Sequence, residues 1–152
     1  MADGRRAACA AAALAFLATP AATQSAALVY SEDGLSIPSP LTGEPGDAGR
    51  GLEIVRDAAQ ASCLICHAMP IAEEPDHGNI GPPLDGIGDR LSEGELRLRL
   101  VDPKRVNPET IMPAYYNSAG LYRVDPPYRG KTIYSAQEVE DVVAYLKTLR
   151  AR

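Results

Sequence analysis

The run Cys63-Leu64-Ile65-Cys66-His67 holds the residues with the clearest chemical purpose in this sequence. It is a C-x-x-C-H motif, the attachment signature of a c-type haem. Two thiols at this spacing add to the two vinyl groups of a porphyrin, and the histidine beside the second thiol then lies under the iron. We therefore expect one covalently attached haem c, with Cys63 and Cys66 as its anchors and His67 as an iron ligand.

Other interpretations of the two cysteines are weaker. A thioredoxin-like redox pair needs a βαβ context, and no such pattern surrounds the motif. A zinc site needs a second pair of ligands, but the remaining cysteine and the remaining histidine, Cys9 and His77, are isolated in the sequence. A structural disulfide between cysteines this close is uncommon. These comparisons favour haem attachment.

The second axial ligand of the iron has two candidates, Met112 and His77. Met69 follows His67 too closely to reach the opposite face of the ring, whereas Met112 lies far along the chain and precedes a proline. A methionine ligand raises the reduction potential of the iron and suits electron transfer. We expect Met112 to bind the iron; the alternatives are that it only fills a gap in the core or that His77, among polar loop residues, takes its place.

Pro82 is a candidate for orienting the proximal histidine. A ligating histidine usually donates its other ring N–H to a carbonyl or carboxylate, which fixes its tautomer. Gly81-Pro82 follows the motif at a suitable distance along the chain. We expect the Pro82 carbonyl to accept this hydrogen bond, although the prolines could instead only stiffen a turn.

Residues 1–27 have the composition of a secretory signal peptide. Arg5 and Arg6 precede an apolar stretch of Ala, Leu and Phe, and Ser25-Ala26-Ala27 offers a cleavage site. The stretch is too short and too rich in alanine for a membrane anchor. We therefore expect a periplasmic protein with no membrane span, in agreement with the motif, because c-type haem is attached outside the cytoplasm.

The charge of the chain argues against a nucleic-acid partner. The 152 residues suit a single domain, and their formal net charge is −5. Residues 1–27 contribute Arg5, Arg6 and Asp3, a net +1, so the mature chain carries about −6. An acidic domain has no electrostatic reason to bind the phosphate backbone.

Helical patterns dominate the remaining chain, and no alternating strand pattern is visible. Capping boxes at Ser92-x-x-Glu95 and Ser135-x-x-Glu138 each open a helix. We expect helices over 51–61, from Ser92 to Asp102-Pro103, and from Ser135 onward, where Val139, Val142, Val143 and Leu146 recur at helical spacing. The prediction is an all-α, class I cytochrome c fold around one haem in residues 49–152, preceded by an extended arm, 28–48, that packs on its own domain or on a partner.

Several longer motifs resemble the SoxX family, the monohaem subunits of the SoxAX cytochrome complex of bacterial sulfur oxidation. The haem motif is shared by all c-type cytochromes, whereas the other stretches are more specific. They are Pro38-Ser39-Pro40-Leu41-Thr42-Gly43, Gly81-Pro82-Pro83-Leu84-Asp85-Gly86, residues 100–116 around Met112, and the closing run 135–146. The resemblance extends from the arm to the C-terminus, and no departure removes a ligand.

The resemblance implies an electron-transfer subunit of the SoxAX L-cysteine S-thiosulfotransferase, in a heterodimer with the SoxA cytochrome. That complex joins thiosulfate oxidatively to a cysteine of the carrier SoxYZ, and SoxA carries the catalytic haem. This chain would then belong to an enzyme without supplying a catalytic residue. Its haem, held by Cys63, Cys66, His67 and Met112, would accept electrons and pass them to a soluble carrier cytochrome c.

Two other functions stay open at this point. One is a free periplasmic monohaem cytochrome c that shuttles electrons to an oxidase, and the other is a haem sensor with an open sixth site. Met112, bounded by a proline, argues against a sensor. The arm and the Tyr-rich stretch 114–134 argue against a minimal free carrier. We expect these two segments to contact SoxA, with Tyr115 and Tyr116 near the haem edge; the alternative is that they pack on the chain's own core.

Overall fold

The computed structural model describes residues 27–60 and 62–151, and its regular elements are all helical. The α-helices are α1 (Ala48–Arg56), α2 (Ile87–Arg90), α3 (Glu93–Val101), α4 (Pro103–Val106) and α5 (Ala136–Thr148). Three 3-10 turns accompany them: η1 (Ala58–Gln60), η2 (Cys63–Ile65) and η3 (Pro126–Tyr128). The predicted all-α class is confirmed. The predicted signal peptide, 1–27, lies outside the described residues except for Ala27.

Helix α1 begins and ends earlier than the predicted range 51–61. Asp47 is its N-cap, and the Asp47 carboxylate accepts a hydrogen bond of 2.8 Å from the Arg50 backbone N–H. At the other end, the Asp57 N–H bonds to the carbonyl of Ile54, and the separate turn η1 follows. The apolar period of Leu52 and Val55 identified the helix, but the cap that sets its start lies before the apolar residues.

Both predicted capping boxes are present. The Ser92 hydroxyl accepts from the Glu95 N–H while the Glu95 carboxylate accepts from the Ser92 N–H, at 2.9 Å. Ser135 and Glu138 repeat the arrangement at the start of α5, with 2.7 Å between the Ser135 nitrogen and the carboxylate. Each box satisfies two backbone donors that a helix start leaves unpaired. The valines and Leu146 of α5 are buried as predicted.

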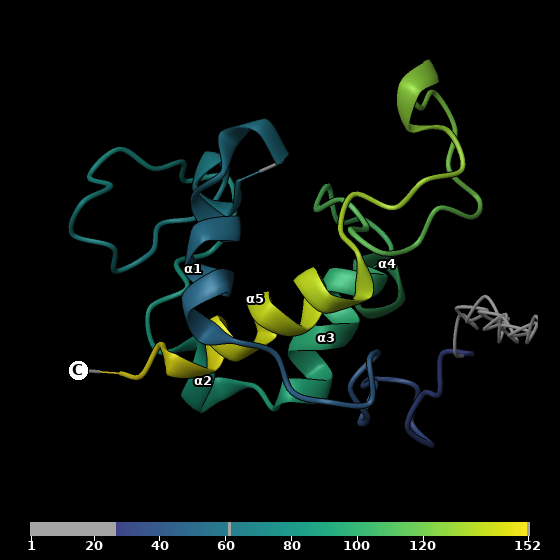
Figure 1. Cartoon of the computed structure of the whole chain (residues 1–152), viewed down its shortest axis with the longest axis horizontal. Coiled ribbons are helices and arrows are strands. Elements are labelled where there is room, and N and C mark those ends of the chain that lie inside the picture. Colours follow the sequence, from purple (N-terminus) through teal and green to yellow (C-terminus); the bar gives the residue numbers. More distant parts are fainter. Residues whose placement is uncertain (1–26, 61, 152) are drawn as a thin grey trace, which may run out of the picture.

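The first and last helices cross at Gly51. Figure 1 shows α1 lying across the middle of α5, with α3 on the other side of α5. A Cβ atom at Gly51 would overlap the backbone carbonyl of Asp141, so only glycine permits this approach of the two helices. The crossing buries Val55 of α1 and Val142 of α5 in one apolar core.

Two consecutive acidic residues of α5 form ion pairs with α1 and α3. Glu140 forms an ion pair with Arg97 of α3 at 2.8 Å, and each of these side chains is 1% exposed. Asp141, 3% exposed, pairs with Arg50 of α1 at 2.7 Å. Buried charges are costly unless they are paired and hydrogen-bonded, and these carboxylates meet both conditions.

The arm packs on its own domain through Ile37 and Leu41. Ile37 is buried, its N–H bonds to the carbonyl of Gly94, and its carbonyl accepts from Arg97 at 2.7 Å. The Leu41 N–H donates to Glu140 at 2.9 Å. Of the two alternatives for the arm, contact with its own domain therefore holds for this part of it.

No helix in the described part of the chain has the length and apolar character needed to cross a membrane.

Candidate haem-binding site

The C-x-x-C-H motif forms a single tight turn that follows α1 and η1 along the chain. The hydroxyl of Ser62 donates to the Val55 carbonyl at 2.7 Å and accepts from the Leu64 N–H, which fixes the start of η2 on the end of α1. The backbone N–H groups of Cys66 and His67 both bond to the carbonyl of Cys63, at 3.1 and 2.9 Å. This turn places Cys63 in the apolar core and holds Cys66 and His67 in the same turn.

The Cys63 thiol is unlike the reactive thiol of a redox-active pair. Cys63 is buried and Cys66 is half-buried, and both are free thiols. Burial raises the pKa of the Cys63 thiol to about 11. Reactive C-x-x-C pairs instead have a thiol whose pKa is lowered to roughly 3.5–7.5. Cys63 therefore lacks the lowered pKa of the reactive thiol in such a pair.

The imidazole of His67 is oriented by Pro82. Its Nδ1 atom lies 2.7 Å from the Pro82 carbonyl oxygen. A carbonyl oxygen can only accept, so Nδ1 carries the proton and the lone pair lies on Nε2. That tautomer presents Nε2 as the atom available to a metal. This is the contact that the spacing of Gly81-Pro82 led us to expect.

The loop 68–86 folds back over the motif. The N–H groups of Gly78 and Gly81 bond to the carbonyls of Leu64 and Cys66, each at 2.8 Å. A Cβ atom at Gly81 would overlap the His67 ring, and one at Gly78 would overlap the Ile65 carbonyl. Sequence reasoning did not reveal the role of either glycine in the site. For Gly81, its position next to Pro82 was the available signal.

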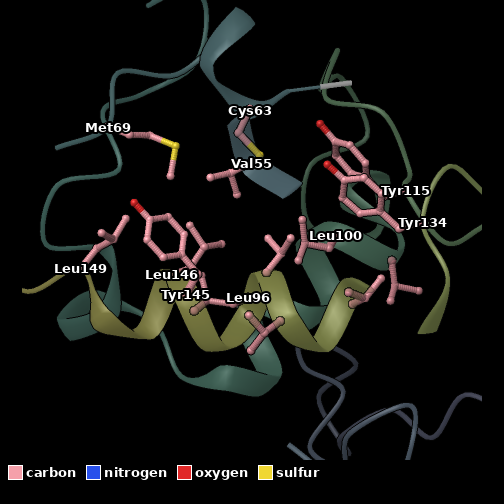
Figure 2. Packing of buried hydrophobic residues seen from close by; sticks show 14 of the residues in the cluster. Val55, Cys63, Met69, Leu96, Leu100, Tyr115, Tyr134, Tyr145, Leu146 and Leu149 are labelled. Atoms are coloured by element: carbon pink, nitrogen blue, oxygen red, sulfur yellow. The ribbon is translucent and has the colours of Figure 1, made fainter. Parts of the chain in front are cut away.

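Two stacked tyrosines lie beside the thiols. The rings of Tyr115 and Tyr134 lie 4.6 Å apart, centroid to centroid, with an interplanar angle of 22°. Figure 2 shows them on one side of Cys63, with Met69 on the other side and α5 beneath. Burial raises the pKa of Tyr115, and the nearby Cys63 and Cys66 thiols add to this rise. Tyr115 is thus buried in the chain's own core, as the alternative to a partner contact proposed.

Met112 lies on a loop three residues before Tyr115. Its side chain is half-buried and packs against the apolar core, and its N–H bonds to the Thr110 hydroxyl. Met112 lines an open cavity of about 1260 Å³, together with Ala59 and Gln60 from the segment that leads into the motif. Cys63, Cys66 and His67 do not line that cavity, so the structure does not bring all four residues together in one pocket.

The remaining candidates for the second axial position are Met69 and His77. Met69 is buried in the core, and His77 is exposed in the loop 68–86. Within residues 27–60 and 62–151, no three His, Cys, Asp or Glu side chains gather closely enough to hold a metal ion. A zinc site built around the two cysteines therefore has no support in this part of the chain.

The residues present fit a covalently bound haem. Two free thiols lie in one turn, the Nδ1–H of a histidine is held by a carbonyl, and the lack of a side chain at Gly81 lets the loop pack against the histidine ring. The sequence profile of the cytochrome c family matches residues 52–150. The chain belongs to the cytochrome c family: it binds one haem c covalently and transfers electrons.

A solved structure gives a more specific likeness. In the crystal structure of SoxXA from P. pantotrophus, one chain is 38% identical to this one with a TM-score of 0.69. The similarity covers 81% of this chain and 94% of that chain. This chain is accordingly a SoxX-like monohaem cytochrome. No curated protein sequence matches it.

Proposed function

We propose that this chain is the electron-accepting subunit of a SoxAX (SoxXA) L-cysteine S-thiosulfotransferase, paired with a SoxA cytochrome. The observation that carries the proposal is the likeness to a chain of SoxXA, which runs over most of both chains at 38% identity. A fold match at low identity would support only the cytochrome fold. This likeness covers 81% of this chain and 94% of that chain, so it extends well beyond the haem motif.

In this proposal four side chains hold the cofactor. Cys63 and Cys66 form the thioethers, His67 binds the iron through Nε2, and Met112 supplies the second axial ligand. Bound haem provides a one-electron centre whose potential depends on its axial ligands. Pro82 keeps the proton on Nδ1 of His67 and so holds the ring in its ligating tautomer.

The chain itself is proposed to be non-catalytic. Cys63 and Cys66 are the cysteines of the described chain, and haem attachment consumes both, so neither could carry a thiosulfate-derived sulfur. His67 is committed to the iron, and His77 is exposed in the loop 68–86. Its task is to receive electrons from SoxA and pass them to a soluble cytochrome c.

The proposed location is the periplasm, reached through the signal peptide over residues 1–27. Residues 28–48 form the arm and 49–152 the cytochrome c domain. Ile37 and Leu41 anchor the arm to α3 and α5, and Val29 and Leu35 remain exposed. These exposed residues, together with those between Met112 and α5, are available for contact with SoxA.

Co-expression of the mature chain with a SoxA subunit tests this function. We expect the two to co-purify, and we expect the haem of this chain to be reduced only when SoxYZ and thiosulfate are both present. Omitting SoxYZ and thiosulfate in turn provides the controls. A chain that stays monomeric and exchanges electrons freely with an oxidase would instead be a diffusible carrier, and the proposal would be wrong.

A further inference from the structure

The segment 117–133, called here the insert, has a charge opposite to that of the rest of the chain. It contains Arg123, Arg129 and Lys131 and a single acid, Asp125, for a net charge of +2. The whole chain carries −5, so the remaining residues sum to −7, since −5 − 2 = −7. A local field of this sign on an acidic protein favours encounters with negative groups.

The three cations converge on one small hollow. A cavity of about 340 Å³ is lined by Arg123, Arg129 and Lys131, and no carboxylate lines it. The Arg129 side chain is tied to the insert by a hydrogen bond of 3.1 Å from Nε to the Val124 carbonyl. The backbone of Arg123 has a φ of 59°, a left-handed conformation that is uncommon for a long side chain. The insert thus gathers three cations around one hollow.

Apolar side chains stand exposed around the same hollow. Leu121 is 48% exposed, Tyr122 85% and Tyr128 59%. Tyr115 and Tyr134, which flank the insert, are buried in the core, whereas Ile111, just before Met112, is exposed like the side chains of the insert. Tyrosine and arginine are enriched at protein–protein interfaces, and exposed apolar groups rimmed by polar ones mark such sites. A small anion alone would not require these exposed rings.

The insert also borders Met112. The larger cavity, of about 1260 Å³, is lined by Met112 and by Tyr122, Arg123 and Lys131 of the insert. A molecule seated on the insert would therefore lie beside the proposed sixth ligand of the iron. Electron transfer needs such proximity between a docked partner and the haem edge.

We propose that the insert is the docking surface for a redox protein that presents clustered carboxylates around an apolar centre. The cations of the insert pair with the carboxylates, and Tyr122 and Tyr128 pack against the apolar centre. If the proposed function holds, on which this identification of the partner rests, the occupant is the subunit that delivers the electron. Its contacting face is then acidic.

Small redox reagents test where the cations act, without any protein partner. The reduced holoprotein is mixed with hexacyanoferrate(III), which takes one electron from the haem iron and becomes hexacyanoferrate(II). Attraction to the insert predicts a rate that falls about tenfold as ionic strength rises. Repulsion by the net negative charge predicts a rate that rises with salt, and that result would overturn the proposal. Hexaammineruthenium(III), a cation, should show the opposite salt dependence.

A matched pair of triple variants separates local charge from net charge. Arg123→Gln, Arg129→Gln and Lys131→Gln together change the net charge by −3 and should abolish or reverse the salt dependence with hexacyanoferrate. The control, Ser39→Glu, Ala72→Glu and Ala151→Glu, makes the same change at exposed positions outside the insert and should retain it. Equal behaviour of the two variants would mean that only net charge matters, against the proposal.

Two competitors distinguish a protein partner from a small oxyanion. Poly-L-glutamate should slow oxidation of the wild-type chain by hexacyanoferrate several-fold, and it should lose this effect on the variant without insert cations. Saturable competition by millimolar thiosulfate or sulfate at fixed ionic strength, with no effect of poly-L-glutamate, would make the hollow an oxyanion site and overturn the docking surface. These assays need neither SoxA nor SoxYZ, so a failed docking surface and a failed enzyme-subunit function give different results.

Discussion

Gly81 packs against the imidazole ring of His67, with no space between them for a methyl group. Pro82, the next residue, accepts the hydrogen bond from Nδ1 of the same ring. One dipeptide therefore controls both the position and the tautomer of the proposed proximal ligand. Gly81 also holds the loop 68–86 against the motif, because its N–H donates to the Cys66 carbonyl.

Gly81→Ala should displace His67 and disturb the haem spectrum. The new methyl group must push the ring or the loop aside, at a cost of about 1–3 kcal/mol in the free energy of unfolding. Urea unfolding and the visible spectrum measure the two effects. Gly120→Ala is the control, because a Cβ there meets nothing, although its φ of 72° makes alanine strained. We expect the control to lose some stability with an unchanged spectrum; an unchanged spectrum in Gly81→Ala as well would refute the steric argument.

Met112→Ala should lower the reduction potential and allow carbon monoxide to bind the iron. Loss of the thioether leaves the sixth position open, and axial ligands set haem potentials over roughly 0.8 V. Redox titration and the carbon monoxide difference spectrum provide the readouts.

Met69→Ala is the matched control for that experiment. Met69 is buried in the core beside Cys63, so its truncation should cost about 2–5 kcal/mol of stability while the iron keeps its ligands. If instead Met112→Ala keeps its potential and excludes carbon monoxide, another residue is the ligand.

The parts of this fold that follow from local sequence were predicted, and those that depend on distant pairing were not. Each capping box, at Ser92 and at Ser135, is formed by two residues three positions apart. The start of each helix can therefore be predicted from the local sequence alone. The partners of Glu140 and Asp141 lie 43 and 91 positions away, and no local pattern selects them. The start of α1 at Ala48 likewise depends on Asp47, which also donates its backbone N–H to Asp141.

The candidate site divides in the same way. The spacing of the C-x-x-C-H motif identifies Cys63, Cys66 and His67, because the chemistry itself fixes that spacing. The sequence groups its tyrosines in the stretch 114–134, but the structure buries Tyr115 and exposes Tyr122. Tyrosine has an apolar ring and a polar tip, so its type alone does not indicate which side of a surface it takes. The cost of a side chain at Gly78 is visible only once the loop and the motif are in contact.

Breaking the Arg97–Glu140 pair from one side should be far more damaging than replacing both residues. Each single variant, Arg97→Met or Glu140→Leu, leaves a buried charge without its partner, at a cost of about 3–5 kcal/mol. The double variant removes both charges and should cost much less than the sum of the singles. A double-mutant cycle by urea unfolding measures this coupling, and additive single effects would contradict it.

Hydrogen exchange at Leu41 separates the two single variants. The Leu41 N–H donates to Glu140, so its exchange should accelerate in Glu140→Leu. In Arg97→Met the carboxylate remains to accept this bond, and exchange at Leu41 should stay slower. Equal exchange in both variants would mean that Glu140 does not hold the arm.

Asp141 should make the stability of the chain depend on pH in the acid range. Burial alone would raise its pKa, but hydrogen bonds from Arg50, the Asp47 N–H and Gln137 outweigh it and lower the pKa. A carboxyl group whose pKa is lower in the folded state stabilises the fold above its unfolded pKa of about 3.9. That contribution is lost as the pH falls through the folded pKa. Asp141→Asn should therefore cost about 1–3 kcal/mol at neutral pH.

The difference between wild type and Asp141→Asn should shrink as the pH falls below about 4. Arg50 is 60% exposed, so its part of the effect is screened and should weaken in salt. Urea midpoints from pH 7 to pH 2.5, in low and high salt, give the measurement. Asp76→Asn, at an exposed loop position, is the control and should leave the curve unchanged. A gap between wild type and Asp141→Asn that stays constant over this range would show that packing of the side chain, and not its charge, links α1 to α5.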